Sequence, residues 1–368
     1  MTSTTTATTA SGLEGVVVAD TRLSEVDGER GRLVIAGHDI ERLAGAVTFE
    51  DIAALLWRGE LPTPAAREEL RRAIADGRAL AFERLAALGD ALTHRDGMDA
   101  LRAAVAHLSD DRGFGDPARL TGAVAVFAGA WSRLRAGAPP IAPDLDLPHA
   151  ADYLRMLTGR APDPARVAGL DAYLVTVADH GMNASTFAAR VVTSTGSDLV
   201  SAIVAAIATL KGPLHGGAPG PVLDMLDAIA EPARAGAWID AELAAGRRIM
   251  GMGHRIYRVR DPRAAVLERA LARLEQAGVS TGRLALARAV EQTAEGALRA
   301  KYPHRSLAAN VEFYTAVLLD TLGIDRAAFS PTFAVGRVAG WCAHVAEQRA
   351  TGRLIRPASR YIGPAPAA

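Results

Sequence analysis

Four histidines with unusual neighbours are the first residues in this chain that could do chemistry. His215 lies in LKGPLHGGAPG and His254 in MGMGHRIYRVRDPRA, so glycines flank both, and His180 lies in DHGMNAST. Glycine neighbours let a ligand approach an imidazole closely, and imidazole can donate or accept a proton near neutral pH. His344, in WCAHVAEQ, has helical spacing among apolar residues. We interpret it, like the other five histidines, as a structural or surface residue.

Three charged side chains accompany these histidines. Arg263 falls in the first turn of a helix that Asp261 should cap, where side chains lean back toward the loop of His254. An arginine fork and an imidazole that face one space suit a small ligand with a carboxylate and a carbonyl. Glu312 and Arg337 each interrupt an apolar run, where a buried carboxylate must be paired or reactive and a buried arginine needs an anion. The alternatives are a solvated charge for Arg263 and a first-turn glutamate favoured by the helix dipole for Glu312.

Composition and missing motifs argue against several classes of protein. The chain has 41 basic and 41 acidic residues among 368, and this balance argues against a nucleic-acid partner. The long uncharged runs at 120–132 and 199–210 are too short to cross a membrane, and we expect no secretory signal. A single cysteine, Cys342, allows no internal disulfide, so we expect a cytoplasmic protein. Motifs for metal, P-loop and dinucleotide binding are missing, so we expect no metal and no resident cofactor.

Most of the chain has helical periodicity. Residues 1–12 are polar and predict a disordered tail, and β-favouring runs at 16–18 and 33–35 predict a small hairpin. Thr48 and Asp51 resemble the capping box of a helix that ends at Gly59, and residues 137–148 read as a loop. Further helices are predicted at 65–90, at 98–109, within 166–210 as two helices joined by 179–183, from 262 to 278, from about 282 to 301, at 311–322 and at 333–349. The apolar run 199–210 predicts a helix that is buried on nearly all faces. The predicted fold class is all-α with at most a minor β element.

Together these motifs resemble the citrate synthase family, in its shorter bacterial form. The resemblance is carried by HGG at 215–217, GHR at 253–255 and DPR at 261–263, and also by DHGMNASTFAARVVTSTGSDL and NVEFYTAVLLDTLGI. It runs from about residue 13 to 363. It implies an all-helical homodimer whose subunits have a large domain, 13–215 plus 323–368, and a small domain, 216–322. The active site would lie in the cleft between them and close on binding.

The resemblance also implies an activity and a role for each motif residue. The chain would condense oxaloacetate with acetyl-CoA and hydrolyse the thioester to give citrate and CoA, with acyl-CoA as a substrate rather than a cofactor. His215 would hydrogen-bond the thioester oxygen, and His254 would bind and protonate the oxaloacetate carbonyl. Glu312 stands where the family usually has the catalytic aspartate of an NVD motif. The residues implied to hold oxaloacetate are His180, Arg263, Arg337 and, from the neighbouring subunit, Arg356; Arg258 matches a basic position near the CoA phosphates.

Two alternatives to a citrate synthase stay open from the sequence. A 2-methylcitrate synthase would use propionyl-CoA, and one extra carbon is worth only ~1–3 kcal/mol in a pocket. A catalytically weak homologue would bind a dicarboxylate and CoA as a regulator. Glu312 favours this last alternative, because its extra methylene could move the carboxylate by ~1.5 Å. The presence of both His215 and His254 argues against it.

Overall fold

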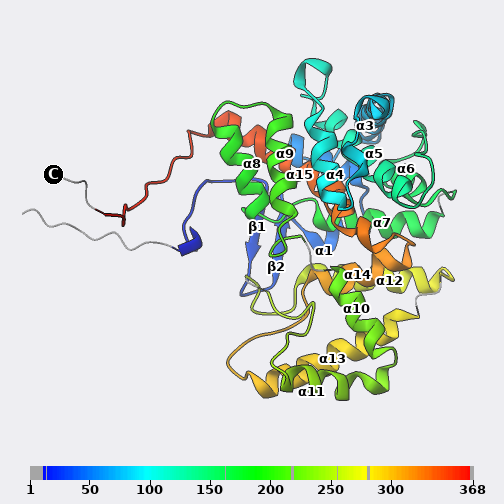
Figure 1. Cartoon of the computed structure of the whole chain (residues 1–368), viewed down its shortest axis with the longest axis vertical. Helices are drawn as coiled ribbons and strands as arrows, with labels where there is room; N and C mark the ends of the chain where they lie inside the picture. The colour runs from blue at the N-terminus through cyan, green and yellow to red at the C-terminus, as the bar shows by residue number, and fades with distance from the viewer. Residues whose placement is uncertain are drawn as a thin grey trace, which may run out of the picture.

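Helices make up most of the molecule, and one small sheet lies near the N-terminus (Figure 1). The structure is a computed structural model that describes residues 11–13, 15–161, 163–216, 219–254, 256–279 and 282–364. The predicted all-α class with a minor β element is confirmed. Most of the predicted N-terminal tail lies outside the described residues, and its end begins a 3₁₀ turn, Ser11–Leu13. No helix in the described part of the chain is long and apolar enough to cross a membrane.

The sheet is an antiparallel meander of β1 (Ser24–Asp27), β2 (Arg32–Ile35) and β3 (His38–Asp39). The predicted second half of the hairpin is correct, but its first half is wrong, because residues 16–18 form no strand. Val16 and Val17 are exposed, whereas Leu33 and Ile35 on β2 are buried. β-branched residues favour a strand only where a neighbouring strand and a core can cover them.

Several helices of the first half begin and end at capping residues that can be predicted from the sequence. After the single turn α1 (Ile40–Leu43), α2 (Phe49–Arg58) begins with the predicted capping box, in which Thr48 and Asp51 each accept a hydrogen bond from the other's amide. It ends at Gly59, whose φ of 84° is left-handed. The next helices are α3 (Pro64–Glu83), α4 (Gly97–Ala106), α5 (Pro117–Arg135) and α6 (His149–Thr158). Residues 137–148 form the predicted loop.

The region 166–210 holds three helices rather than the predicted two. They are α7 (Pro164–Val177), α8 (Ala184–Ser194) and α9 (Leu199–Leu210). The chain turns at Gly196, with a φ of 85°, and Asp198 then caps α9 by accepting a hydrogen bond from the Ser201 amide at 2.7 Å. The prediction that α9 is buried on nearly all faces is correct for one face only, since Ala208 is exposed.

The second half contains α10 (Pro219–Ile229), α11 (Ala235–Ala244), α12 (Pro262–Gln276), α13 (Arg283–Lys301), α14 (Val311–Thr321) and α15 (Phe329–Thr351). α10, α11 and α13 lie at one end of the molecule, and α12 packs on both α14 and α7 (Figure 1). α15 runs through the core and packs on α2, α5, α7, α8 and α9. It starts four residues before its predicted start because a 3₁₀ turn, Arg326–Ala328, leads directly into it. The predicted boundaries between a large and a small domain stay a prediction.

Candidate active site

The loop that carries His254 is hydrogen-bonded to the segment that leads into α14. The Gly253 amide donates to the Ala308 carbonyl at 2.8 Å, and the Asn310 amide donates to the Gly251 carbonyl at 2.9 Å. Gly251 and Gly253 have φ values of 75° and 86°, which favour glycine over any other residue. These bonds join the His254 loop to the start of α14, whose first turn carries Glu312.

His254 is a neutral imidazole whose free N–H lies on Nε2. Its Nδ1 accepts hydrogen bonds from the amides of Ile256, at 2.9 Å, and Tyr257, at 3.1 Å. A ring nitrogen that accepts carries no proton, so the proton of the neutral ring is on Nε2. Burial, followed by the charge of Arg263, lowers the pKa of His254 to about 4. The ring is therefore neutral at pH 7 and can donate from Nε2 to a ligand oxygen.

His180 and Tyr257 pack around His254. The ring centroid of His180 lies 5.9 Å from that of His254 and 5.6 Å from that of Tyr257. The Nε2 atom of His180 is 3.1 Å from the Tyr257 hydroxyl. Burial, followed by the charges of Arg263 and Arg337, holds the pKa of His180 well below its usual value. The only sequence signal for Tyr257 is its position three residues after His254.

His215 reaches the site from the loop that follows α9. Its Nε2 lies 2.8 Å from the hydroxyl oxygen of Ser185, which also accepts a hydrogen bond from the Trp341 indole at 3.1 Å. The same hydroxyl donates to the side-chain oxygen of Asn183 at 2.8 Å. Burial, followed by the charge of Arg337, lowers the pKa of His215 to about 4. Within the described residues, only the Nε2 side of this neutral ring is hydrogen-bonded, so Nδ1 is available to a ligand.

Arg263 is buried, which excludes the alternative of a solvated helix charge. Its Nε and Nη2 donate to the two carboxylate oxygens of Asp261, at 3.0 and 2.8 Å. Asp261 also accepts hydrogen bonds from the Arg263 amide, at 3.0 Å, and from the Val311 amide, at 3.2 Å. Burial alone would lower the pKa of Arg263, but Asp261 outweighs burial and raises it. The aspartate thus fixes the guanidinium between the starts of α12 and α14.

Arg337 is a second buried cation, on α15. Its Nε donates to the Val177 carbonyl, and its guanidinium carbon lies 4.7 Å from the centroid of the Phe333 ring. Burial lowers its pKa to about 10, against the opposing effect of Asp179. It is therefore charged at pH 7. In the described part of the chain, Nε is the only guanidinium atom of Arg337 with an acceptor, so its two Nη groups can take a ligand carboxylate.

Glu312 is the carboxylate of the site. Its amide donates to the Asn310 side chain at 3.0 Å, while its own half-buried carboxylate has no hydrogen-bond donor among the described residues. Burial raises its pKa to about 7; Arg263 opposes this shift and Asp261 adds to it. A carboxylate with a pKa near neutrality is suited to remove a proton from carbon and to return it.

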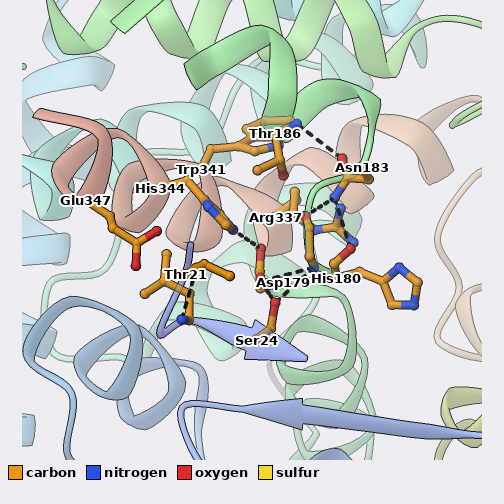
Figure 2. A network of polar contacts seen from close by, with 12 residues as sticks. Thr21, Ser24, Asp179, His180, Asn183, Thr186, Arg337, Trp341, His344 and Glu347 are labelled. Atoms are coloured by element: carbon orange, nitrogen blue, oxygen red, sulfur yellow. Dashed lines mark hydrogen bonds and ion pairs between the residues drawn. The ribbon is translucent and has the colours of Figure 1, made fainter. Parts of the chain in front are cut away.

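A buried polar network supports these residues from behind (Figure 2). The Asp179 carboxylate accepts hydrogen bonds from His344 Nε2, at 3.1 Å, and from the Ser24 hydroxyl. Arg190 donates to the other nitrogen of His344 at 2.8 Å. Asp179 directly precedes His180, so the network ties that histidine to β1, α8 and α15. His344 lies in this supporting network, in line with its interpretation as structural.

The turn between β1 and β2 supports the His254 loop on its other side. The Gly28 carbonyl accepts a hydrogen bond from the Arg258 amide at 2.8 Å. A Cβ atom on Gly28 would lie 2.4 Å from the Ile256 carbonyl oxygen, so only glycine fits without a shift of the backbone. The minor sheet therefore holds the loop that presents His254.

The structure brings together six of the eight site residues proposed from the sequence, namely His180, His215, His254, Arg263, Glu312 and Arg337. It does not bring in Arg258 or Arg356. The Arg258 side chain is exposed on the loop that follows His254, and Arg356 is exposed in the extended C-terminal segment. Figure 1 shows that segment leaving the body of the molecule. Among the described residues, no group of three or more metal-binding side chains could hold a metal ion.

Comparisons with known proteins agree over nearly the whole chain. Residues 12–358 match the family model described as citrate synthase, C-terminal domain. The chain is 38% identical to a citrate synthase of Haloferax volcanii, covering 96% of this chain and 95% of that protein. It is also 38% identical to a 2-methylcitrate synthase of Mycobacterium tuberculosis, covering 96% and 90%. A citrate synthase of Thermoplasma acidophilum, solved as a ternary complex with carboxymethyl coenzyme A and oxaloacetate, superposes with a TM-score of 0.87 at 28% identity, covering 98% of each chain.

Proposed function

This chain belongs to the citrate synthase family, and we propose that it condenses oxaloacetate with acetyl-CoA and hydrolyses the thioester to citrate and CoA. It is an enzyme of the citrate synthase type. One observation supports the assignment of the site more than any other. A carboxylate with a raised pKa, Glu312, interacts with both buried arginines, Arg263 and Arg337, and each of the neutral imidazoles His254 and His215 interacts with one of them.

In the first step, Glu312 removes a proton from the methyl group of acetyl-CoA. That proton is weakly acidic, so the developing enolate oxygen needs a fixed donor in a site without water. His215 supplies the donor from Nδ1 once the Ser185 hydroxyl, which donates to the Asn183 side-chain oxygen in the structure, turns to donate to His215 Nε2 instead. The neutral ring then carries its proton on Nδ1.

In the second step, the enolate carbon attacks the ketone carbon of oxaloacetate. The electron pair of the carbonyl bond moves to its oxygen, and His254 donates to that oxygen from Nε2 and protonates it. Arg263 and Arg337 bind the two carboxylates of oxaloacetate through their guanidinium forks. His180 adds a third contact. Water then attacks the thioester carbon, the C–S bond breaks, and CoA leaves as the protonated thiol.

The glutamate at position 312 fits this scheme. A side chain one methylene longer than aspartate needs a site built around it, because an error of about 1 Å in position can cost ~100-fold in rate. Asn310 holds both the amide of Glu312 and the His254 loop, through bonds of 3.0 Å and 2.9 Å. The same residue thus sets the carboxylate and the imidazole relative to each other.

Release of free CoA thiol tests the proposed function. Purified protein should release thiol from acetyl-CoA only when oxaloacetate is present. A matched series with propionyl-CoA separates the two enzymes, since faster turnover with propionyl-CoA would make the chain a 2-methylcitrate synthase. This second candidate is supported by the 2-methylcitrate synthase relative, which is as similar to the chain, at 38% identity, as the citrate synthase relative is. If neither thioester releases thiol in the presence of oxaloacetate, only the binding-protein alternative is left.

The proposal extends to a homodimer in which Arg356 binds oxaloacetate in the partner's site. It is supported by the exposed C-terminal segment, in which Leu354, Tyr361 and Ile362 are exposed apolar side chains. Arg356→Gln should then raise the KM for oxaloacetate, and size-exclusion chromatography with mass measurement should give twice the mass of the chain. A monomeric active enzyme would contradict this part. We also propose that Arg258 meets the CoA phosphates, and that the enzyme works in the cytoplasm.

A further inference from the structure

A cavity of about 580 Å³ lies away from the residues assigned to catalysis. It opens where the ends of α5 and α6 meet the start of α7 and the turn that follows α14. Its floor is apolar and is made by buried side chains, Leu154, Leu157, Leu322 and Ile324. This volume is within the range of sites that hold small organic molecules.

Four arginines line the cavity, namely Arg133, Arg135, Arg160 and Arg166. In the described part of the chain, none of the four forms an ion pair. Arg133 donates to the Pro139 carbonyl at 3.2 Å, and Arg166 donates to the Thr321 carbonyl at 2.5 Å. The cavity's two carboxylates, Asp163 and Asp325, each accept a hydrogen bond from a helix amide. The lining thus carries more positive than negative charge.

Stabilisation of helix ends does not account for this cluster. Arg133 and Arg135 lie in the last turn of α5, where a cation interacts favourably with the helix dipole. Arg166, however, lies in the first turn of α7, where the helix end is itself positive. Arg160 follows the end of α6, and its exposed side chain has no hydrogen-bond acceptor among the described residues. Four unpaired cations around one apolar floor leave an anion to be supplied from outside the chain.

We propose that this cavity binds an organic anion that carries two or more acidic oxygens on a small apolar body. Guanidinium groups bind carboxylate or phosphate oxygens through paired hydrogen bonds, and the leucine and isoleucine floor covers the apolar body. A purely inorganic anion would leave that floor exposed to water.

The position of the cavity connects it to the catalytic residues. α7 begins at the cavity, and its other end leads to His180. α14 ends at the cavity, and its first turn carries Glu312. Each helix has more than ten residues, so at 1.5 Å per residue the two sites are separated by roughly 16 Å or more. The cavity is therefore a second site, joined to the first by two rigid elements.

Calorimetric titration of the full chain with phenyl phosphate tests the proposal. This probe has a phosphate dianion on an apolar ring, and phenol and inorganic phosphate supply each part alone. Phenyl phosphate should bind more tightly than either part. The double variant Arg135→Gln/Arg160→Gln, which removes two exposed cations, should weaken its binding by at least ~10-fold, the effect of losing about 1.4 kcal/mol. The matched control Arg95→Gln/Arg112→Gln removes two exposed arginines elsewhere that form no ion pair with any described residue, and it should bind like the wild type.

Two results would overturn the proposal. One is the absence of phenyl phosphate binding at millimolar concentration in the wild type. The other is equal affinity in the wild type and in Arg135→Gln/Arg160→Gln, since binding would then be at the oxaloacetate site or nonspecific. Heat of binding is independent of turnover, so failure of the proposed function would leave this result unchanged. Neither variant touches the catalytic residues, so oxaloacetate-dependent thiol release should stay at the wild-type rate.

Discussion

Asp179 and Glu312 are two carboxylates in one charged region, and they differ in the hydrogen-bond donors around them. Asp179 is fully buried, and its oxygens accept hydrogen bonds from His344, Ser24 and the Gly181 amide. Burial alone would raise its pKa, but His344, Arg337 and Ser24 lower it below its usual value. Glu312 has no such donors in the described chain, and burial raises its pKa to about 7.

This difference separates a supporting carboxylate from a reactive one. A buried carboxylate that accepts several hydrogen bonds is held as an anion and stabilises the fold. A carboxylate whose burial is not compensated is a stronger base and is available to a substrate. The number of hydrogen bonds that the carboxylate accepts, rather than burial or charge alone, therefore distinguishes the two roles.

Glu312→Gln should lower turnover by about 10³-fold, because general base catalysis typically contributes 10²–10⁴-fold. Oxaloacetate should still bind, since Arg263, Arg337 and His254 are unchanged. Steady-state thiol release and oxaloacetate titration measure the two effects. A near-normal rate would show that the base lies elsewhere and that the lack of hydrogen-bond donors around Glu312 does not make it reactive.

Asp179→Asn should have its main effect on stability. The amide nitrogen would face donors that now bind a carboxylate oxygen, and removal of one partner from a buried ionic network costs about 3 kcal/mol. Urea unfolding measures this loss. The matched variant Glu312→Gln should lose no stability at pH 8. Equal destabilisation of both variants would remove the distinction between the two carboxylates.

Glu312→Asp should reduce kcat by about 100-fold, because the carboxylate would retreat by roughly one C–C bond. The KM for oxaloacetate should change little. Comparison of kcat and KM for this variant measures how closely the site is adapted to glutamate. An unchanged or faster enzyme would show that the position tolerates both lengths.

The rate should depend on pH through Glu312. Its ionised form is needed, so kcat/KM should be constant above about pH 7 and fall tenfold per unit below it, while His215 and His254 stay neutral down to about pH 4. The raised pKa also makes the wild type less stable as pH rises from 4.5 to about 7. The stability advantage of Glu312→Gln should grow over that interval. A pH profile without a step near 7 would argue against the assigned base.

Ser24→Ala should have the smallest effect, a loss of about 1 kcal/mol in the free energy of unfolding. It removes the bonds of the hydroxyl to Asp179 and from the Gly181 amide, but that amide and His344 still donate to Asp179. Thermal or urea unfolding of this variant measures the loss. A loss as large as that of Asp179→Asn would mean that the strand, rather than the carboxylate, organises the network.

Much of the molecule could be predicted from local sequence. The capping box at Thr48 and the proline after Asp261 fix where two helices begin, because caps act within one turn. Val16 was misassigned to a strand because the neighbour that a strand needs cannot be read from a β-favouring run. The break at Gly196 is a different miss, because the polar run TSTGSD at 193–198 is itself typical of a turn followed by a helix N-cap.

The candidate site was predictable only where a motif marks it. Glycine-flanked histidines and an arginine after a capping aspartate can be recognised in the linear sequence. The residues that hold them do not, because Ser185, Asp179 and Trp341 meet His215 and His344 through packing of distant helices. Their partners depend on tertiary structure, which no local pattern records.

The role of Glu312 as the base is tested most directly by exchange of the methyl protons of acetyl-CoA with deuterated water. A dicarboxylate that lacks the ketone, such as malate, would occupy the oxaloacetate site without allowing condensation, so only the proton transfer would be seen. The wild type should incorporate deuterium in the presence of malate, and Glu312→Gln should not. Exchange in Glu312→Gln at the wild-type rate would contradict the account.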